Sequence, residues 1–221
     1  MDHLTRAYIA LLRFGFRLLY NELAFTYDAV SWIVSLGEWR RWQQAAIPHL
    51  NAPTGSLILE LAHGTANLHI DLRQMGYRMI GLDLSAYMGA IARRKLLKHN
   101  LLPQLVRGQA QALPFPDTTF DAVVSTFPTE FIVDPATIHE IYRVLKPGAR
   151  LVFVPSGALT GRGVIEQGVE LAYKATGQRG MWPEYIMERF TAAGFTLTTL
   201  IEPCYRSMAQ VVIAEKPRGD G

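Results

Sequence analysis

The sequence predicts an α/β fold, in which a mostly parallel sheet is covered by helices on both faces. From residue 56 onward, short apolar runs alternate with segments of helical periodicity, and this alternation is typical of right-handed βαβ units. No strand pattern precedes residue 56, and near the C-terminus two strand-like runs are joined by a loop too short for a crossover helix. Such a short connection requires an antiparallel pair, so the sheet is expected to end with an antiparallel strand.

The individual elements follow from the spacing of apolar residues and from the breaks between them. Strands are predicted over residues 56–61, 77–83, 102–107, 120–126, 149–155, 196–202 and 208–215. Helices are predicted over residues 4–20, 26–36, 39–50, 67–75, 85–99, 135–145 and 184–193. Pro135 suits the first turn of its helix, and Gly194 suits a C-terminal cap. Residues 1–55 are therefore expected to form a helical lid, and residues 56–221 a domain built on the sheet.

Composition limits the classes of function. The chain has 221 residues, of which 49% are hydrophobic and 19% charged, as expected for one globular domain. The formal net charge is only +3 and no block of like charges is present, so we expect no nucleic-acid partner. The single cysteine, Cys204, excludes an intrachain disulfide and fits a reducing, cytoplasmic location. The six histidines form no HExxH or other close ligand pair, so no metal is predicted.

The apolar segment 4–20 is predicted to be neither a signal peptide nor a membrane span. Arg13 and Arg17 interrupt it, no small-residue cleavage site follows, and a span needs about 20 mostly apolar residues. On a helix, Arg6, Arg13 and Arg17 fall on one side. This pattern suits either contact of residues 1–20 with a membrane surface or burial of the helix against the lid or in a homodimer.

Three strand ends predict a ligand site at one edge of the sheet. In an open parallel sheet, ligands bind outside the carboxyl ends of the strands. The first strand ends at Glu60, just before the loop that contains Gly64, and the second ends at Asp83, 19 residues beyond Gly64. This is close to the spacing at which an acid after the second strand binds a ribose hydroxyl pair. The third strand leads into Gln109 and Ala110, which would lie beside the same crevice, so we expect an adenosine site.

Structural interpretations of the two acids remain open. Asp83 lies near the start of the next predicted helix and could serve as its N-cap, although Ser85 already suits that role. Glu60 could be an acid at a strand end that pairs with a basic neighbour.

The loop after the first strand lacks the glycines of a dinucleotide site. The three glycine positions of the G-x-G-x-x-G template fall on Ala62, Gly64 and Asn67. That template needs glycines so that backbone can approach a pyrophosphate and so that helix and strand can pack closely. The loop therefore favours an adenosine cofactor without phosphates, and an NAD(P)-dependent oxidoreductase is the alternative.

Four stretches carry a family resemblance. They are "ILELAHGTANL", "GLDLS", "ALPFPDTTFDAVV" and "VLKPGARLVFV", in this order and spacing. Together they resemble the class I S-adenosylmethionine-dependent methyltransferases, and more specifically the ubiquinone/menaquinone C-methyltransferase (methyltransferase type 11) family. The stretch "YDAVSWIVSLGEWRRW", residues 27–42, also resembles that family. The resemblance implies a Rossmann-like three-layer sandwich with a seven-stranded sheet and an N-terminal helical lid. It also implies S-adenosylmethionine as cofactor and S-adenosylhomocysteine as product.

The resemblance also implies which residues bind the cofactor. Glu60, Gly64 and Thr65 would line its methionine end, and Asp83 would accept both ribose hydroxyls. Gln109 and Ala110 would meet the adenine, at positions where the family usually has Asp or Asn followed by Ala. The complete implied set is Glu60, Ala62, Gly64, Thr65, Asp83, Leu84, Gln109, Ala110 and Thr126.

Departures from the family pattern concern the loop and the acceptor. His63 and Ala66 replace smaller residues of the loop, and residues 127–131, "FPTEF", do not match the segment that faces the family's substrate. The quinone substrate is therefore not carried over as such, and we expect a small, apolar acceptor of lipid or quinone-like character. His63 and Glu130 are candidate general bases by position, whereas His139 fits a surface or packing role better.

The sequence thus predicts a methyltransferase that transfers a methyl group to this acceptor, with two alternatives. One is the oxidoreductase, and the other is a non-catalytic adenosyl-binding protein, which the unusual His63, Ala66 and Gln109 would suit. Aromatic residues crowd the predicted lid, as suits an apolar acceptor; among them are Tyr27, Trp32, Trp39 and Trp42.

Overall fold

A computed structural model describes residues 26–161 and 184–219 of the chain. The predicted helix 4–20, and with it the proposed membrane contact of residues 1–20, lies outside the described residues. Within these ranges, no helix is both long and apolar enough to cross a membrane.

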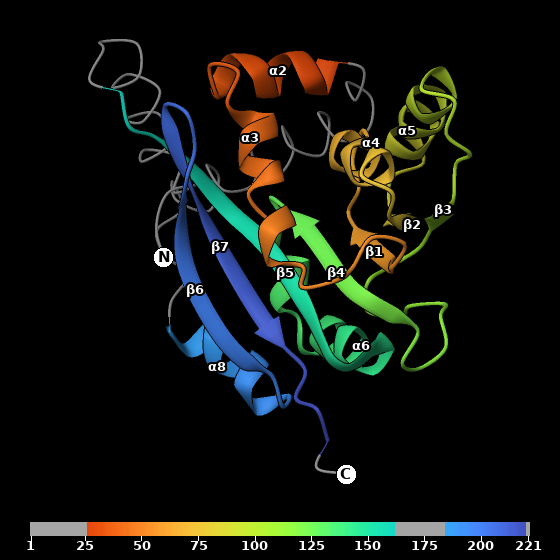
Figure 1. Ribbon diagram of the computed structural model, residues 1–221, viewed down its shortest axis with the longest axis vertical. Coiled ribbons are helices and arrows are strands. Elements are labelled where there is room, and N and C mark those ends of the chain that lie inside the picture. Colours follow the sequence, from red (N-terminus) through yellow and green to blue (C-terminus); the bar gives the residue numbers. More distant parts are fainter. Residues whose placement is uncertain (1–25, 162–183, 220–221) are drawn as a thin grey trace, which may run out of the picture.

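One sheet organises the molecule (Figure 1). Its seven strands have the order β3-β2-β1-β4-β5-β7-β6, and β7 runs antiparallel to both of its neighbours. The predicted mostly parallel sheet with an antiparallel C-terminal strand is therefore confirmed. The strands are β1 (Leu57–Leu61), β2 (Arg78–Asp83), β3 (Leu105–Arg107), β4 (Phe120–Thr126), β5 (Leu145–Leu159), β6 (Thr196–Pro203) and β7 (Ser207–Glu215).

Helices cover both faces of this sheet. The described helices are α2 (Tyr27–Val34), α3 (Trp39–Gln44), α4 (Asn67–Gln74), α5 (Ala86–Lys98), α6 (Pro135–Val144) and α8 (Glu184–Ala192), with short 3-10 helices η2 (Ile47–His49) and η3 (Glu130–Val133). Because side chains alternate along a strand, Val123 of β4 joins the core with α6 and α8, whereas Ala122 and Val124 join the core with α3 and α4. This arrangement confirms the three-layer sandwich.

Several predicted elements differ from the structure in their bounds. The strand expected over residues 102–107 covers only Leu105–Arg107. The helix expected over 39–50 ends at Gln44 and is followed by the separate 3-10 helix η2, because Pro48 has no N–H to continue an α-helical ladder. The strand expected over 149–155 extends from Leu145 to Leu159, and its pairing with β7 shifts register between Phe153 and Ser156. At its other end, β5 pairs with β4 through a second register shift, between Phe120 and Ala122.

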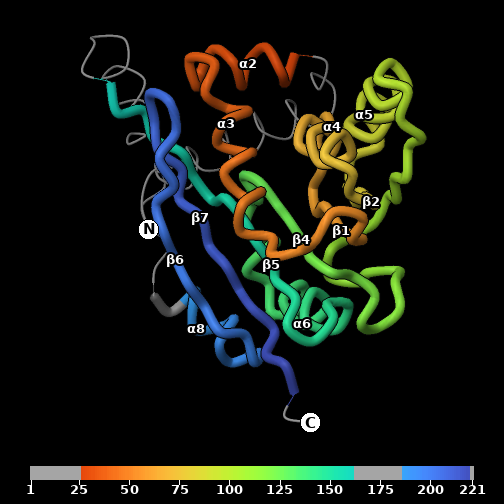
Figure 2. Tube along the Cα trace, viewed as in Figure 1, coloured from red at the N-terminus to blue at the C-terminus, as the bar shows by residue number. Residues whose placement is uncertain are grey.

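The two described helices of the lid differ in their packing. Trp42 of α3 is buried in the sheet core, where its Nε1 donates to Ser207 Oγ at 2.8 Å. Gly157 of β5 makes room for this ring, since a Cβ there would lie 2.2 Å from Trp42 Cδ2. By contrast, α2 lies across the end of the molecule toward which β4 points (Figures 1 and 2). The division of the chain into a lid and a sheet domain at residue 55 remains a prediction. The close packing of α3 on the sheet joins these two predicted parts.

Candidate functional site

The Asp83 carboxylate is held in place by backbone groups at the carboxyl edge of the sheet. The Gly64 N–H donates to its Oδ2 at 2.9 Å, and the Ser85 N–H donates to its Oδ1 at 2.8 Å. An ionised carboxylate has about four lone-pair sites, so both oxygens can still accept hydrogen bonds from a ligand. The Ser85 side chain accepts the Met88 N–H and is itself the N-cap of α5. Ser85 therefore caps α5, and the Asp83 carboxylate is an oriented hydrogen-bond acceptor.

The loop after β1 reaches Asp83 through an unusual backbone. Ala62, Gly64 and Ala66 have φ angles of 55°, 52° and 65°, a left-handed region that costs an L-residue about 1–2 kcal/mol. The Ala62 N–H donates to Leu82 O at 2.8 Å, which ties the start of the loop to β2. The resulting curl directs the Gly64 N–H toward Asp83.

The loop after β3 lies beside the end of β2. The Gly108 N–H donates to the Asp83 carbonyl at 3.2 Å, which places Gln109 and Ala110 next to the acid. Gln109 is exposed and Ala110 is buried. Burial of apolar side chains is favourable, yet Leu84, directly after Asp83, has 60% of its surface exposed. The predicted ribose and adenine residues therefore lie at one edge of the sheet; their contacts with a cofactor remain predictions.

Glu60 has a basic neighbour, as expected if it is a structural acid at the end of a strand. It is only 2% exposed at the end of β1, and its Oε2 lies 3.1 Å from Nδ1 of His69 in α4. Among the described residues, Nε2 of His69 has no hydrogen-bond partner. The role of Glu60 at the cofactor ammonium remains a prediction.

The two candidate bases occupy different environments. His63 is 4% exposed and packs over Gly81 of β2, where a Cβ would lie 2.9 Å from its Cδ2. Its Nδ1 donates to Gly64 O at 2.9 Å. This placement favours a packing role. Glu130 lies exposed in η3, and His139 is exposed on α6, as expected for a surface residue. The catalytic roles of His63 and Glu130 remain predictions.

A polar cluster joins α2 to the loop after β1. Asp28 Oδ1 accepts hydrogen bonds from Thr65 Oγ1 at 2.6 Å and from Asn67 Nδ2 at 3.1 Å. Lys95 Nζ of α5 donates to Asp28 Oδ2 at 2.8 Å. Partial burial acts to raise the pKa of Asp28, but the hydrogen bonds from Lys95 and Thr65 and the Lys95 charge together lower it below its ordinary value of 3.8. Thr65, expected at the methionine end, is thus in contact with the lid.

Sequence reasoning missed Asp28 and Lys95 as contributors to this edge of the sheet. Asp28 belongs to the stretch "YDAVSWIVSLGEWRRW" that resembles the family, and this was a usable signal. Lys95 lies within a helix rich in basic residues, and nothing in its sequence context distinguishes it.

The end of β4 forms an aromatic and polar wall with α3. Glu60 pairs with Val124 in the sheet, so Thr126 lies two residues further toward the carboxyl edge. Thr126 Oγ1 accepts a hydrogen bond from Gln43 Nε2 at 3.2 Å. The next residue, Phe127, has a φ of 51°, and its ring stacks on Trp39 with 3.9 Å between centroids. Thr126 therefore lies where the lid meets the strand ends.

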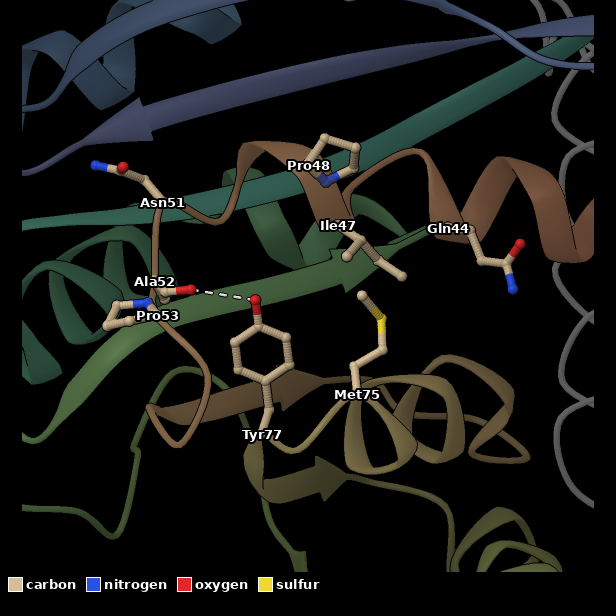
Figure 3. A pocket seen from close by; sticks show the side chains of 8 residues that line it. All are labelled: Gln44, Ile47, Pro48, Asn51, Ala52, Pro53, Met75 and Tyr77. Atoms are coloured by element: carbon tan, nitrogen blue, oxygen red, sulfur yellow. Dashed lines mark hydrogen bonds between the residues drawn. The ribbon is translucent and has the colours of Figure 1, made fainter.

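The described part of the chain has at least two hollows on its surface. The first, of about 610 Å³, lies near the amino ends of β1 and β2, where the Tyr77 hydroxyl donates to Ala52 O at 3.1 Å (Figure 3). It is lined by Gln44, Ile47, Pro48, Asn51, Ala52, Pro53, Met75 and Tyr77. The second, of about 380 Å³, lies between α5 and β3 and includes Asp83 and His63 in its lining. Only the second hollow borders the predicted cofactor residues. Within the described ranges, no three His, Cys, Asp or Glu residues are grouped to hold a metal ion.

The sheet order and the acid at the end of β2 fit a Rossmann-like methyltransferase, and comparisons with known proteins give the class. The family described as "Methyltransferase domain" matches residues 59–153. A demethylmenaquinone methyltransferase from Thermus thermophilus is 36% identical over 148 residues, which cover 63% of this chain and 67% of that protein. The chain therefore belongs to the family of S-adenosylmethionine-dependent methyltransferases that includes the demethylmenaquinone methyltransferases, as the sequence predicted.

Other relatives match over different shares of their length. A demethylmenaquinone methyltransferase from Symbiobacterium thermophilum is 36% identical over 142 residues, and the match covers 62% of this chain but 57% of that protein. A solved structure from Methanococcus maripaludis, described as a candidate S-adenosyl-L-methionine-dependent methyltransferase, matches with a TM-score of 0.65 at 20% identity and covers 91% of this chain and 95% of that one. This second likeness concerns the fold alone.

Proposed function

We propose that the chain is an S-adenosylmethionine-dependent methyltransferase that acts on a small, apolar acceptor. The observation that carries this proposal is the Asp83 carboxylate, which two backbone N–H groups hold at the carboxyl edge of the sheet. A carboxylate so oriented suits the two adjacent hydroxyls of a ribose. The exposed Leu84 beside it offers an apolar surface for an adenine. A Cβ built at Gly64 would meet no atom within 4 Å, so the loop has open space at its turn.

Methyl transfer requires the protein mainly to position the acceptor atom. The bound cofactor supplies a methyl group on a sulfonium sulfur. The chain has to hold the acceptor atom in line at about 3 Å and exclude water. The acceptor atom loses a proton as it gains the methyl group, and His63 or Glu130 is the proposed base.

An acceptor of lipid or quinone-like character has two sources of support. The relatives from Symbiobacterium thermophilum and Thermus thermophilus carry the name demethylmenaquinone methyltransferase. In addition, Trp39 and Phe127 stack beside Thr126 at the end of β4, and flat aromatic faces suit a ring acceptor.

A membrane surface is the proposed source of this acceptor. Residues 1–20 combine apolar side chains with a basic stripe, which suits binding at anionic headgroups. On α2, Trp32 is 65% exposed and Ile33 is 60% exposed, and both would add apolar contact. The full chain should co-sediment with anionic liposomes, and a chain lacking residues 1–22 should remain largely in the supernatant. Equal sedimentation of both would contradict this role. A homodimer is the other proposed partner of residues 1–20, and sedimentation velocity would report it.

Product analysis tests the reaction class. The full chain is incubated with S-adenosylmethionine and hydroquinones that carry apolar tails, and the extracts are analysed by mass spectrometry. We expect an acceptor heavier by one methylene unit, with equimolar S-adenosylhomocysteine. Oxidation of NADH or NADPH without methyl transfer would favour the oxidoreductase instead. Binding of S-adenosylhomocysteine without any product across the panel would favour the non-catalytic adenosyl-binding protein.

A further inference from the structure

An acid and a histidine form a buried pair where β1 meets α4. Glu60 is 2% exposed and His69 is 1% exposed, and Glu60 Oε2 lies 3.1 Å from His69 Nδ1. The second ring nitrogen, Nε2, is also buried and has no hydrogen-bond partner within the described ranges. A buried polar group without a partner calls for an explanation. The proposed methyl transfer uses neither side chain as a base, so the pair is open to another role.

Burial restricts the total charge that the pair can carry. A charge in a protein interior is costly unless an opposite charge lies beside it. A pair of zero total charge is either a carboxylate with an imidazolium or a carboxylic acid with a neutral imidazole. In both forms one proton lies between Oε2 and Nδ1, and a second proton is on Nε2. We therefore expect Nε2 of His69 to be protonated in the protein without ligand.

Other charged groups surround α4, which packs on α3 and β2. The titratable and charged residues on these elements and on the adjoining loop and helix are Glu38, Arg40, Arg41, His63, Asp71, Arg73, Arg78, Asp83 and Lys95. Within the described part of the chain, none of them is hydrogen-bonded to the His69 ring. Arg40 pairs with Asp71, whereas Arg73, one turn beyond His69 on α4, adds a positive charge that favours loss of a proton. Glu60 is thus the group that directly sets the protonation of His69.

We propose that His69 is a positioning residue that holds Glu60 for the ammonium group of the cofactor, and that the pair releases the Nε2 proton when the ammonium binds. This inference rests on the proposed methyltransferase function and adds a proton linkage to it. An ammonium beside a pair of zero charge would leave one positive charge uncompensated in a buried site. Breaking the Nε2–H bond and passing its proton to solvent leaves a carboxylate, a neutral imidazole and an ammonium, whose charges cancel.

Nitrogen NMR of the histidine rings in the full chain tests this without relying on a variant. Protonated and unprotonated ring nitrogens differ in chemical shift, and the signals of His69 are identified by their loss in His69→Asn. At pH 7 we expect Nε2 to be protonated in the free protein and unprotonated when the protein is saturated with S-adenosylhomocysteine. Methylthioadenosine has the same adenosine and thioether without the amino acid, and it should leave Nε2 protonated. An Nε2 that does not change with S-adenosylhomocysteine would overturn the inference.

Calorimetry counts the same proton. Titrations at pH 7 in phosphate and in Tris, which differ in their heat of ionisation, should show release of about 0.5–1 proton per S-adenosylhomocysteine bound. Decarboxylated S-adenosylhomocysteine keeps the amine and should release as much, whereas methylthioadenosine should release none. The affinity for S-adenosylhomocysteine should rise by up to about tenfold per pH unit in the range of this release. Equal release with methylthioadenosine would assign the proton to another group and contradict the proposal.

Substitutions of the acid test its part in the linkage. Glu60→Gln removes the charge and keeps an acceptor for Nδ1, so Nε2 of His69 should be in the same state with and without S-adenosylhomocysteine. The affinity should fall about tenfold or more, since the ammonium loses a charged acceptor. Glu188→Gln, on an exposed residue of α8, is the control and should keep the proton release and the affinity of the unsubstituted chain.

Substitutions of the histidine test the positioning. His69→Asn keeps a donor close to the place of Nδ1, and His69→Leu removes it. S-adenosylhomocysteine should bind about threefold more weakly to the Asn variant and about tenfold or more weakly to the Leu variant. Equal loss in both variants would show that the hydrogen bond to Glu60 does not position it.

The outcomes separate this inference from the function on which it rests. If the unsubstituted chain gives no heat with S-adenosylhomocysteine, the proposed function fails. If the ligand binds while the Nε2 signal of His69 stays unchanged, only the proton linkage fails. Melting curves report whether each variant is folded, and the comparison of ligands on the unsubstituted chain decides the linkage even if a variant does not fold.

Discussion

At the scale of single residues, the left-handed backbone of the loop after β1 determines where the Gly64 N–H points. Ala62 and Ala66 adopt positive φ angles that glycine would adopt more easily. The spacing between Gly64 and Asp83 could be predicted from the sequence because it follows the general geometry of βαβ units. The hydrogen bond between them could not, since it depends on the φ angles of two alanines.

The strain in this loop gives a stability prediction. Ala62→Gly should raise the free energy of unfolding by about 0.5–1 kcal/mol, because relief of about 1–2 kcal/mol of left-handed strain exceeds the entropy that glycine adds to the unfolded chain. Urea denaturation measures the change. Ala46→Gly is the matched control, since Ala46 has a φ of −71° and its substitution should destabilise the fold. Equal destabilisation by both would show that the Ala62 backbone carries no strain.

At the scale of elements, the lid meets the cofactor loop through α2. The strands could be predicted because each is a short apolar run between turn residues, and the register of the parallel strands then places the carboxyl ends together. The contacts of α2 and α3 could not be predicted in the same way. Asp28, Gln43 and Lys95 are ordinary polar residues on helices, and only the packing of α2, α3 and α5 brings them to the sheet edge.

Removing the ion pair of the polar cluster should loosen α2 without unfolding the chain. The Asp28 side chain is 45% exposed and that of Lys95 is 26% exposed, so the pair contributes no more than about 1 kcal/mol. In Lys95→Met, amide hydrogens of α2 should exchange about two- to fivefold faster, as measured by hydrogen-exchange mass spectrometry. Lys98→Met, on an exposed residue of the same helix, is the control. Faster exchange throughout the sheet would instead indicate general destabilisation.

At the scale of the whole molecule, several carboxylates tie distant segments together. Glu140 of α6 accepts the Leu113 N–H at 2.7 Å and pairs with Arg143, whose hydrogen bond is the main cause that lowers the pKa of Glu140 below 4.5. Partial burial acts to raise the pKa of Asp121, but bonds from Lys146 and the Leu57 N–H lower it below 3.8 overall. The alternation of strands and helices predicted the layers of the fold. The hydrogen bonds and ion pairs of these carboxylates depend on loop geometry and follow no periodic pattern in the sequence.

These lowered pKa values predict acid sensitivity. A carboxyl group whose pKa is lower in the folded state than in the unfolded chain stabilises the fold at pH values above its unfolded-state pKa. This stabilisation is lost as the pH falls through the folded-state pKa. The free energy of unfolding should therefore begin to fall below about pH 4.5, the ordinary value for Glu140. Glu140→Gln should flatten the fall and lower stability at pH 7, whereas Glu188→Gln, on an exposed residue of α8, should change neither. Urea titrations from pH 3 to 7 measure this, and an unchanged slope in Glu140→Gln would contradict it.

Binding of the ribose of an adenosyl cofactor by Asp83 is tested most directly by calorimetric titration with S-adenosylhomocysteine. Asp83→Asn should weaken binding by about 1.5–3 kcal/mol, because a charged acceptor of two hydroxyls becomes a neutral one. Asp117→Asn, whose side chain is 73% exposed, should bind as the unsubstituted chain does, and NAD+ should give no heat with any of the three proteins. Equal affinity of the Asp83 variant and the unsubstituted chain for S-adenosylhomocysteine would contradict the account.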